Sequence, residues 1–339
     1  MSKELSLIKE CKSWKECNQE ISKLTAGQQA KFGGSVFEHV VKLYLETDPK
    51  YQTKFKKIWL LDEVPYKVKQ FLHLPEADEG IDLIIKTNED EYWSVQAKYR
   101  SNIDETLVFA GKGGLSTFQS LSFLTCKNIS HGLICTTVNK PPVKKHLLKN
   151  IGFEVADTWL SLDENKFLGW KLIQSKAKGK NLTIKPAIPR PHQKNAINEA
   201  KKHFLALKNQ KGKMIMPCGT GKSLTSFWIA HQLKANNVIV AVPSIALIKQ
   251  TLNTWTTETI LNNKKIDWLC VCSDESVYNY QDEIISNTSD LGIKSTTNQK
   301  EIENFLKHKT KYLKVIFTTY QSGKVLAKAS RKLKISFDL

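Results

Sequence analysis

Two short apolar runs joined by polar residues predict a β-hairpin in the first half of the chain. The runs cover residues 81–85 and 92–98, and the polar turn between them centres on residues 88–90. Side chains alternate along a strand, so Gln96 and Lys98 are expected on one face of the second strand. If the two strands pair, Asp82 comes alongside both residues.

A helical pattern precedes this hairpin. Between residues 35 and 46, apolar residues fall on a broad helical stripe, and Glu38 lies at the edge of that stripe. Gly33 and Gly34 are expected just before the helix begins. The other elements expected in this domain are a first strand, a later helix and a buried strand, at residues 58–64, 115–124 and 131–138.

A second α/β pattern follows a short basic stretch, "SKAKGKN", that has little to bury. In this later part, residues 238–243 and 315–322 predict buried strands. The chain is therefore expected to have three parts, namely a first domain with an N-terminal helical arm, a linker and a second domain, at residues 1–170, 171–187 and 188–339.

Composition narrows the class of protein. The chain has 339 residues, of which 41% are hydrophobic, enough to fill a core in each of two domains. Its formal charge of +18 at pH 7 favours a polyanionic partner, most simply nucleic acid. Seven scattered cysteines favour reduced thiols in a cytoplasmic protein. Since no apolar run reaches the length of a membrane span, we expect no membrane partner.

The end of the predicted hairpin carries groups that suit phosphodiester hydrolysis. The Asp82 carboxylate can hold Mg²⁺, which accepts one or two protein carboxylates and keeps several waters. A bound metal activates water, and Lys98 can orient that water or offset charge on the phosphorus. Read singly, Asp82 is a turn residue and Lys98 is a solvated strand end. The ordered set favours a nuclease site.

The motifs "GID" and "QAK", with Asp82 and Gln96 fourteen positions apart (96 − 82), resemble the PD-(D/E)xK nuclease fold. They resemble its Mrr-like restriction branch in particular, in which Gln commonly replaces the acidic member. The resemblance implies a restriction-endonuclease-like αβ domain in which Asp82 and Gln96 bind the metal. The catalytic residues that it implies are Glu38, Asp82, Gln96 and Lys98.

A glycine-bearing loop, "MPCGTGKS", follows a predicted strand that begins at Met214 and precedes a predicted helix. In such a loop, backbone amides hold nucleotide phosphates at the N-terminus of the helix. Lys222 is expected to pair with the β- and γ-phosphates, and Ser223 to bind Mg²⁺. The sequence thus predicts an ATP site formed by Gly219, Thr220, Gly221, Lys222 and Ser223.

This loop resembles the form found in superfamily 2 helicases and translocases. The resemblance implies an incomplete RecA-like parallel α/β motor domain, with Arg190 and Gln193 at the nucleotide and Gln193 reading the adenine edge. Core strands of any α/β domain are the alternative reading for the stretches beyond the loop. The residues expected at the DNA backbone are Ser244, Gln250, Thr318, Thr319 and Ser322.

Together the two resemblances are typical of DNA-translocating restriction enzymes, especially the type ISP kind and the motor subunit of type I. Such an enzyme translocates double-stranded DNA with ATP and cuts it with Mg²⁺. The final residues, "KISFDL", look like the start of the strand that leads to the Asp-Glu pair of such motors. We therefore expect a longer protein that adds this pair, the second motor lobe, a methyltransferase and a target-recognition domain, and we expect inefficient ATP turnover by this chain.

Two functions remain open from the residues alone. In the first, the N-terminal domain is a Mg²⁺-dependent DNA endonuclease. In the second, Gln96 marks a catalytically degenerate nuclease fold that binds DNA as a module of a repair or antiphage helicase. Metal-dependent cutting of DNA distinguishes the two.

Overall fold

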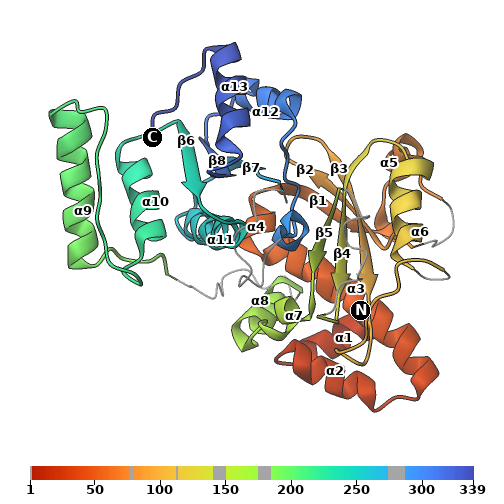
Figure 1. The fold of residues 1–339 in the computed structure, drawn as a ribbon. Helices are drawn as coiled ribbons and strands as arrows, with labels where there is room; N and C mark the ends of the chain where they lie inside the picture. The colour runs from red at the N-terminus through yellow and green to blue at the C-terminus, as the bar shows by residue number, and fades with distance from the viewer. Residues whose placement is uncertain (1, 76–79, 112–113, 140–149, 175–184, 274–286) are drawn as a thin grey trace. The chain divides into compact units, whose positions relative to one another are not determined.

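The chain divides into two compact α/β units in the computed structural model (Figure 1). One unit comprises Met1–Thr183 together with Ser289–Lys294, and the other comprises Ile184–Thr288 together with Ser295–Leu339. Most of the expected linker lies outside the described residues. The described residues are 2–75, 80–111, 114–139, 150–174, 185–273 and 287–339.

A five-stranded sheet forms the centre of the first unit, in the order β1-β2-β3-β4-β5. β2 pairs antiparallel with both β1 and β3, whereas β4 pairs parallel with both β3 and β5. The predicted hairpin is confirmed as β2 and β3. The strands are β1 (Phe55–Leu60), β2 (Leu83–Thr87), β3 (Tyr92–Lys98), β4 (Ile129–Thr136) and β5 (Ile151–Glu154).

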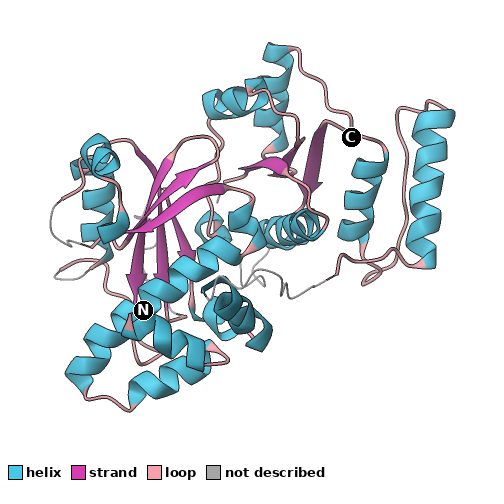
Figure 2. Cartoon of the chain, turned by 180° about the vertical axis from the view of Figure 1, so that it is seen from behind, coloured by secondary structure: helices cyan, strands magenta, loops and turns pink. Residues whose placement is uncertain are grey.

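Helices cover both faces of this sheet, with α3 along one face and α5 and α6 against the other (Figures 1 and 2). α1 and α2 form the N-terminal arm and pack on α3. The helices are α1 (Lys3–Glu10), α2 (Trp14–Ser22), α3 (Ala26–Thr47), α4 (Pro49–Gln52), α5 (Tyr66–Leu72), α6 (Leu115–Ser120), α7 (Ala156–Leu160) and α8 (Glu164–Gln174), with a π-helical turn at Leu121–Thr125.

The two faces of the sheet have different cores. On the α3 face, aromatic rings pack in a connected series that joins α3 to β1 and β3, with centroids 5.0–5.7 Å apart; Tyr51 stacks on Phe55, and the other two contacts are edge to face. Its members are Tyr44, Tyr51, Phe55 and Trp93. On the α6 face, aliphatic residues of β2 and β4 pack on Phe118 and Leu121. Burial on both faces holds the strand register fixed.

Two expected boundaries in this unit are wrong. Gly33 and Gly34 lie inside α3, which begins eight residues before Gly34 at Ala26, after the N-cap Thr25. The first strand ends at Leu60 instead of Val64, because the Glu63 carboxylate accepts the Leu60 amide at 3.0 Å and closes a 3₁₀ turn. Close packing of Gly33 on Tyr99, together with burial of the second half of α3, overrides the poor helix propensity of glycine.

The second unit contains a three-stranded parallel sheet in the order β6-β8-β7. Both expected strands form, as β6 and β8; β8 is buried along its whole length as expected, whereas β6 buries only Val238. Its strands are β6 (Asn237–Val242), β7 (Ile266–Val271) and β8 (Leu313–Thr319), and its helices are α9 (Pro191–Lys201), α10 (Lys222–Gln232), α11 (Ile245–Leu261), α12 (Gln299–Lys307) and α13 (Gly323–Leu333). No helix in the described part of the chain is long and apolar enough to cross a bilayer.

The predicted strand before the glycine-bearing loop is not formed. Residues 214–217 have no ladder partner among the described residues, and Ile215 is 81% exposed. β6 is an edge strand, and its outer edge bonds to the end of the chain instead: the Ile239 amide donates to Leu339 O at 2.9 Å, and the Asp338 amide donates to Asn237 O at 2.8 Å. A strand needs a hydrogen-bonded neighbour, and residues 214–217 have none.

The expectation that Thr318, Thr319 and Ser322 face DNA is also wrong. All three side chains are buried, and they are bonded inside the unit. The Thr318 hydroxyl donates to Val271 O at 2.8 Å, and the Thr319 hydroxyl donates to Ser322 Oγ at 3.1 Å. These residues join β8 to its neighbours.

One buried histidine of the first unit gives its stability a distinct pH dependence. His131 in β4 is 4% exposed and packs on the Trp93 ring with centroids 4.5 Å apart. Burial, aided by the charge of Lys294, lowers the pKa of His131 from 6.5 to about 3. The imidazole is therefore neutral in the folded chain at physiological pH.

We predict that acid destabilises the first unit through His131. Below a pH of about 6.5 the unfolded chain binds a proton at this residue, whereas the folded chain does not bind it until the pH approaches 3. Between about pH 7.5 and about pH 5.5, the wild type should lose about 1 kcal/mol of unfolding free energy relative to His131→Gln. Denaturant titrations of both proteins measure this difference, and a difference independent of pH contradicts the assignment.

Candidate functional site

The β2–β3 hairpin brings the Asp82 carboxylate to the predicted "QAK" segment. The Asp82 amide donates to Val95 O at 2.8 Å, which aligns the start of β2 with β3. Asp82 Oδ2 then accepts the backbone amide of Ala97 at 2.6 Å. Since Ala97 stands between Gln96 and Lys98, the carboxylate lies beside the backbone of both expected partners.

Gln96 is held in one orientation by its own hairpin. Its side chain is 3% exposed, and Nε2 donates to Gly80 O at 2.8 Å. Gly80 has φ +115°, and a Cβ there would lie 3.0 Å from Gln96 Nε2. Glycine is therefore required at this turn, both for its backbone conformation and for the close approach of the amide.

The other end of the Gln96 amide is a buried acceptor. Gln96 Oε1 has no hydrogen-bond partner among the described residues. An unsatisfied buried acceptor costs about 1–3 kcal/mol, so this atom is expected to have a ligand in function. If the amide were flipped, its oxygen would face Gly80 O and the hydrogen bond to that carbonyl would be lost. The NH₂ group therefore stays at Gly80, and the amide oxygen is the end that remains available for a ligand.

Lys98 ends β3 on the same face as Gln96. Ser94 shares that face by alternation, and its hydroxyl donates to Ser122 Oγ at 2.8 Å, which identifies it as the α6 face. The backbone of Lys98 is fixed from β4, because its carbonyl accepts the Thr137 amide at 3.2 Å and the Thr136 hydroxyl at 3.1 Å. The Lys98 side chain is half-buried.

Glu38 lies on α3, the helix that covers the other face of the sheet. α3 passes the end of β3 closely, because a Cβ at Gly33 would lie 2.5 Å from the Tyr99 ring. Glu38 is half-buried one turn further along this helix. The hairpin thus gathers Asp82, Gln96 and Lys98, whereas Glu38 comes from a separate element and stays a prediction as a catalytic residue.

The donor set suits a hard cation that keeps water ligands. Among the described residues, no three His, Cys, Asp or Glu side chains are grouped to hold a metal ion. One carboxylate and one amide oxygen are nevertheless enough for Mg²⁺, which binds proteins through few side chains and retains several waters. Asp82 and Gln96 therefore fit such an ion, and a closed transition-metal site does not fit.

The glycine-bearing loop of the second unit is shaped to start α10. Gly219 has φ +74° and Gly221 has φ +80°, and Gly221 is the N-cap of the helix. A Cβ at Gly221 would lie 2.6 Å from Gln193 Nε2. Both glycines are needed for a loop that turns its backbone amides toward a ligand at the helix N-terminus.

Gln193 binds this loop to α9. Its Nε2 donates to Thr220 O at 3.1 Å, and its Oε1 accepts the Arg190 amide at 2.9 Å. Both ends of the amide therefore serve the protein itself in this structure. Arg190 is the N-cap of α9, so the expected Arg190, Gln193 and Thr220 are brought together.

Lys222 and Ser223 are the first two residues of α10. Lys222 Nζ donates to the carbonyls of Met216 at 3.3 Å and Pro217 at 3.2 Å, across the loop. The Ser223 hydroxyl is buried without a hydrogen-bond partner among the described residues. A cavity of ≈ 1050 Å³ opens beside the loop, lined by Gly219, Gly221, Lys222, Ser223, Gln250 and residues of β6. This volume admits a nucleotide.

The two DNA contacts expected at α11, Ser244 and Gln250, lie in different surroundings. Ser244 is buried and caps the helix by accepting the Leu247 amide at 3.3 Å, so its hydroxyl serves the helix. Gln250 lines the cavity beside the glycine-bearing loop.

Comparison with known proteins separates the two units by family. Residues 46–179 match the restriction endonuclease family of the Mrr catalytic type, and residues 187–338 match the family of the type III restriction enzyme res subunit. No curated protein matches the chain. The chain joins a restriction endonuclease domain to a helicase-like domain. This confirms the resemblance carried by the two motif sets.

A solved structure similar to this chain is that of the ATP-dependent type ISP restriction-modification enzyme LlaBIII bound to DNA. The two share 25% sequence identity and superpose with a TM-score of 0.68. The similarity covers 90% of this chain and 19% of that enzyme. The chain therefore spans about a fifth of the length of LlaBIII.

Two groups that the motif did not point to hold the side chains of Gln96 and Asp82, namely the Gly80 carbonyl and the Ala97 amide. Gly80 is the first residue of "GID", so a glycine before an acidic strand start was a signal for a tight turn. The Ala97 amide had no signal, because every residue of a strand has such a donor and only the register decides its partner.

Adjacent glycines of α3 give a matched test of the contact between α3 and the end of β3. Gly33→Ala should lower the unfolding free energy by about 1–3 kcal/mol, because its methyl group overlaps the Tyr99 ring. Gly34→Ala, with nothing within 4 Å of its Cβ, should raise it by about 1 kcal/mol through helix propensity. Denaturant titration measures both, and equal effects of the same sign contradict the close contact.

Proposed function

We propose that this chain contains the nuclease and the first motor lobe of a restriction enzyme that translocates double-stranded DNA with ATP and cuts it. Two observations carry the nuclease part: the Asp82 carboxylate accepts the Ala97 amide, and the amide oxygen of the adjacent Gln96 is buried without a hydrogen-bond partner among the described residues. The similarity to LlaBIII, solved with DNA, supports DNA as the substrate.

In this proposal each hairpin residue has one task in phosphodiester hydrolysis. Asp82 and Gln96 Oε1 would hold Mg²⁺, and the hydrogen bonds from Ala97 and to Gly80 keep their side chains in place. When bound, Mg²⁺ would act there as a Lewis acid and would lower the pKa of a water that it carries. Lys98 orients the attacking water or offsets the negative charge that develops on the phosphate. Glu38 is proposed as a further acidic group.

The helicase-like domain would bind ATP at the N-terminus of α10. Lys222, now bonded to neutral carbonyls of its own loop, exchanges them for the β- and γ-phosphates, which are better acceptors because they are charged. The buried Ser223 hydroxyl, which has no hydrogen-bond partner among the described residues, would hold Mg²⁺. Gln193 and Arg190 hold the loop in position, and Gln193 is proposed to meet the adenine edge.

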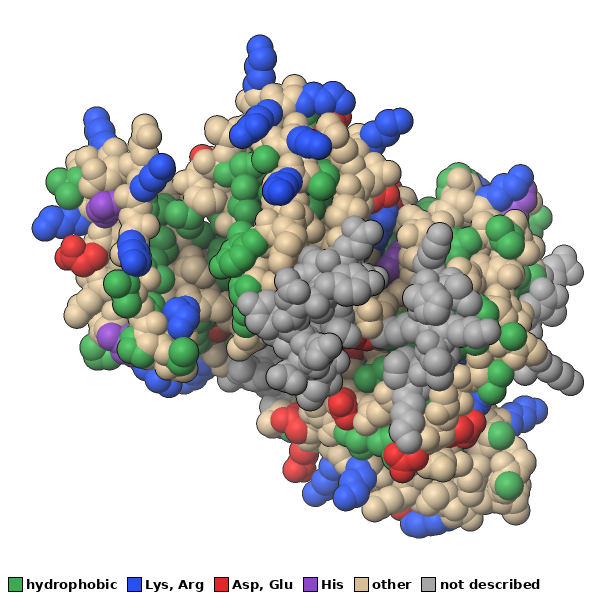
Figure 3. All heavy atoms as spheres, viewed as in Figure 1, with side chains coloured by type: hydrophobic (Ala, Val, Ile, Leu, Met, Phe, Trp, Pro, Cys, Tyr) green, Lys and Arg blue, Asp and Glu red, His purple; other side chains and the backbone are tan. Residues whose placement is uncertain are grey.

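A basic surface on the helicase-like domain supports DNA as partner. Lys and Arg side chains gather over α12 and α13 in the view of Figure 3. Such a predominantly basic surface attracts a polyanion and gives binding that weakens as salt rises. Its exposed members on α13 and just beyond are Lys324, Lys328, Arg331, Lys332 and Lys334.

The second candidate is a nuclease fold that binds DNA without cutting it, as a module of a repair or antiphage helicase. It is favoured by one feature, the neutral Gln96 at the place of a carboxylate, because an amide oxygen binds a cation less strongly. Proteins of this kind would show salt-sensitive duplex binding with no metal-dependent nicking.

Nicking of supercoiled plasmid with and without Mg²⁺ distinguishes the two candidates. Asp82→Asn should lower the nicking rate at least about 100-fold, because it removes the only charged ligand proposed for the ion while keeping an oxygen that accepts the Ala97 amide. Lys98→Ala should have a similar effect. Asp90→Asn, in the exposed turn of the same hairpin, is the matched control and should cut like the wild type. Full nicking activity of both Asp82→Asn and Lys98→Ala would contradict the nuclease assignment.

Binding of a fluorescent ATP analogue with Mg²⁺ tests the loop separately. Lys222→Ala should weaken the affinity about 10–100-fold, the usual range for losing one charge-assisted bond. Lys201→Ala, at the exposed end of α9, removes the same charge elsewhere and should leave the affinity unchanged. Equal dissociation constants for all three proteins contradict the nucleotide site.

A further inference from the structure

A short segment from late in the chain is built into the nuclease domain. Ser289–Lys294 belongs to the first unit, whereas the chain on both sides of it belongs to the second. Its next residue, Ser295, bridges to Cys270 in β7, and the Thr296 amide donates to Cys270 O at 3.0 Å. The segment is therefore covalently continuous with the helicase-like sheet at its C-terminal end.

Buried polar groups of the nuclease domain hold the middle of this segment. Lys50 Nζ lies 2.7 Å from Glu154 Oε1 and donates to Leu291 O at 3.1 Å. The Tyr51 hydroxyl lies 2.6 Å from the same Glu154 oxygen and 2.8 Å from Gly292 O. Lys50 and Glu154 are 3% and 1% exposed, and Leu291 is fully buried. A buried ion pair needs such further partners, because desolvation otherwise offsets its attraction.

Gly292 is the residue that permits this fit. It has φ +64°, and a Cβ there would lie 2.3 Å from Glu154 Oε1 and 2.8 Å from the Tyr51 hydroxyl. Any side chain at this position displaces either the segment or the buried carboxylate.

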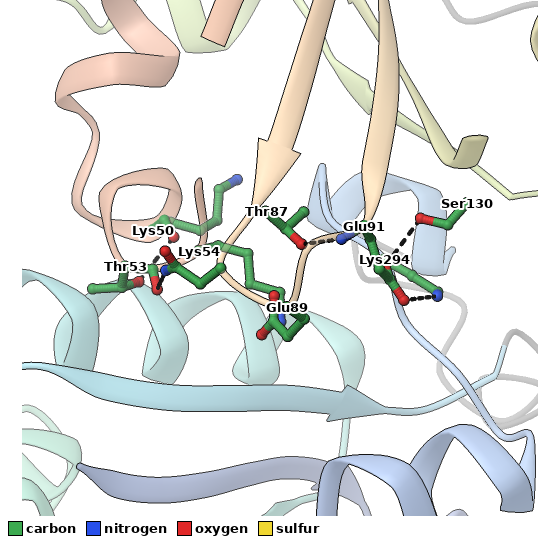
Figure 4. Close-up of polar contacts among 9 residues, drawn as sticks. Lys50, Thr53, Lys54, Thr87, Glu89, Glu91, Ser130 and Lys294 are labelled. Atoms are coloured by element: carbon green, nitrogen blue, oxygen red, sulfur yellow. Dashed lines mark hydrogen bonds and ion pairs between the residues drawn. The ribbon is translucent and has the colours of Figure 1, made fainter. Parts of the chain in front are cut away.

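A second ion pair fixes the end of the segment to the start of β3. Lys294 Nζ lies 3.0 Å from Glu91 Oε1, and Glu91 Oε2 accepts the Ser130 hydroxyl at 2.9 Å (Figure 4). Burial alone would raise the pKa of Glu91, but the charge and hydrogen bond of Lys294 bring it below its usual value. Glu91 is thus ionised and paired at neutral pH. The segment is held at both β5 and β3.

One row of the sheet runs from this anchor to the candidate catalytic carboxylate. Glu154 in β5 is the register partner of Cys135 in β4, and Cys135 is the partner of Ala97 in β3. The Ala97 amide donates to Asp82 Oδ2 at 2.6 Å. Burial, and then the charges of Glu154 and Asp82, raise the pKa of the Cys135 thiol, so both carboxylates act on this one buried group.

We propose that Ser289–Lys294 is a positioning segment through which the helicase-like domain sets the geometry of Asp82 in the nuclease domain. When the segment is bound, Lys50 and Tyr51 hold the Glu154 side chain in place. The paired residues Glu154, Cys135 and Ala97 then keep the Ala97 amide in position to donate to Asp82. A shift of the helicase-like sheet pulls the segment through Ser295 and loosens this row. The nuclease consequence depends on the function proposed above; the structural coupling does not.

Gly292→Ala tests the coupling in the whole chain, with Gly323→Ala as the control, because Gly323 has nothing within 4 Å of its Cβ. Modification of each cysteine by a thiol reagent is followed by mass spectrometry, together with hydrogen exchange of β3. In Gly292→Ala, Cys135 modification and exchange in β3 should rise about tenfold or more, since local opening controls both. Cys126, also buried in the nuclease domain, should react as in the wild type.

Lys294→Ala removes the ion pair with Glu91 without adding bulk to the segment, and it should act in the same direction. It keeps the test valid if Gly292→Ala does not fold. Metal-dependent nicking should fall about tenfold in either variant, while the affinity for the ATP analogue stays the same. A wild type that nicks nothing contradicts the nuclease assignment and leaves the labelling test intact. Protection of Cys135 and β3 equal to that of the wild type in both variants overturns the positioning role.

Discussion

The hydrogen bond from the Ala97 amide to the Asp82 carboxylate is the constraint on which the nuclease domain depends. It ties the residue before β2 to the middle of the "QAK" segment, so it exists only in one register of the hairpin. Aromatic packing under α3 and aliphatic packing under α6 fix that register from both faces. Gly80 then turns the chain so that the Gln96 amide has its oxygen left for a ligand.

Much of this was readable from local sequence. Alternation and the polar turn located the hairpin, and the spacing of "GID" and "QAK" selected Asp82, Gln96 and Lys98. Contacts between residues far apart in the chain decided the features that local sequence did not predict. Gly33 fits inside a helix because Tyr99 occupies the space of its missing side chain. Lys50 and Glu154 form a buried ion pair although they are 104 residues apart, and the sequence around neither residue indicates that it has a partner.

In the helicase-like domain too, local sequence predicted some features and not others. The glycine-bearing loop has the conformation that its residues predict, with two glycines at positive φ and a helix that begins at Lys222. The strand expected before it does not form, because strand structure belongs to pairs of segments and not to one segment's residues. The loop chemistry was thus local and predictable, whereas the sheet around it was not.

The most direct test is to locate a metal ion at the hairpin. Crystals soaked in Mn²⁺, a heavier ion that accepts the same oxygen ligands as Mg²⁺, would show it by anomalous scattering. The expected result is one peak about 2.0–2.3 Å from both the Asp82 carboxylate and Gln96 Oε1. A peak elsewhere in the nuclease domain, with Gln96 Oε1 bonded to protein, would contradict the assignment.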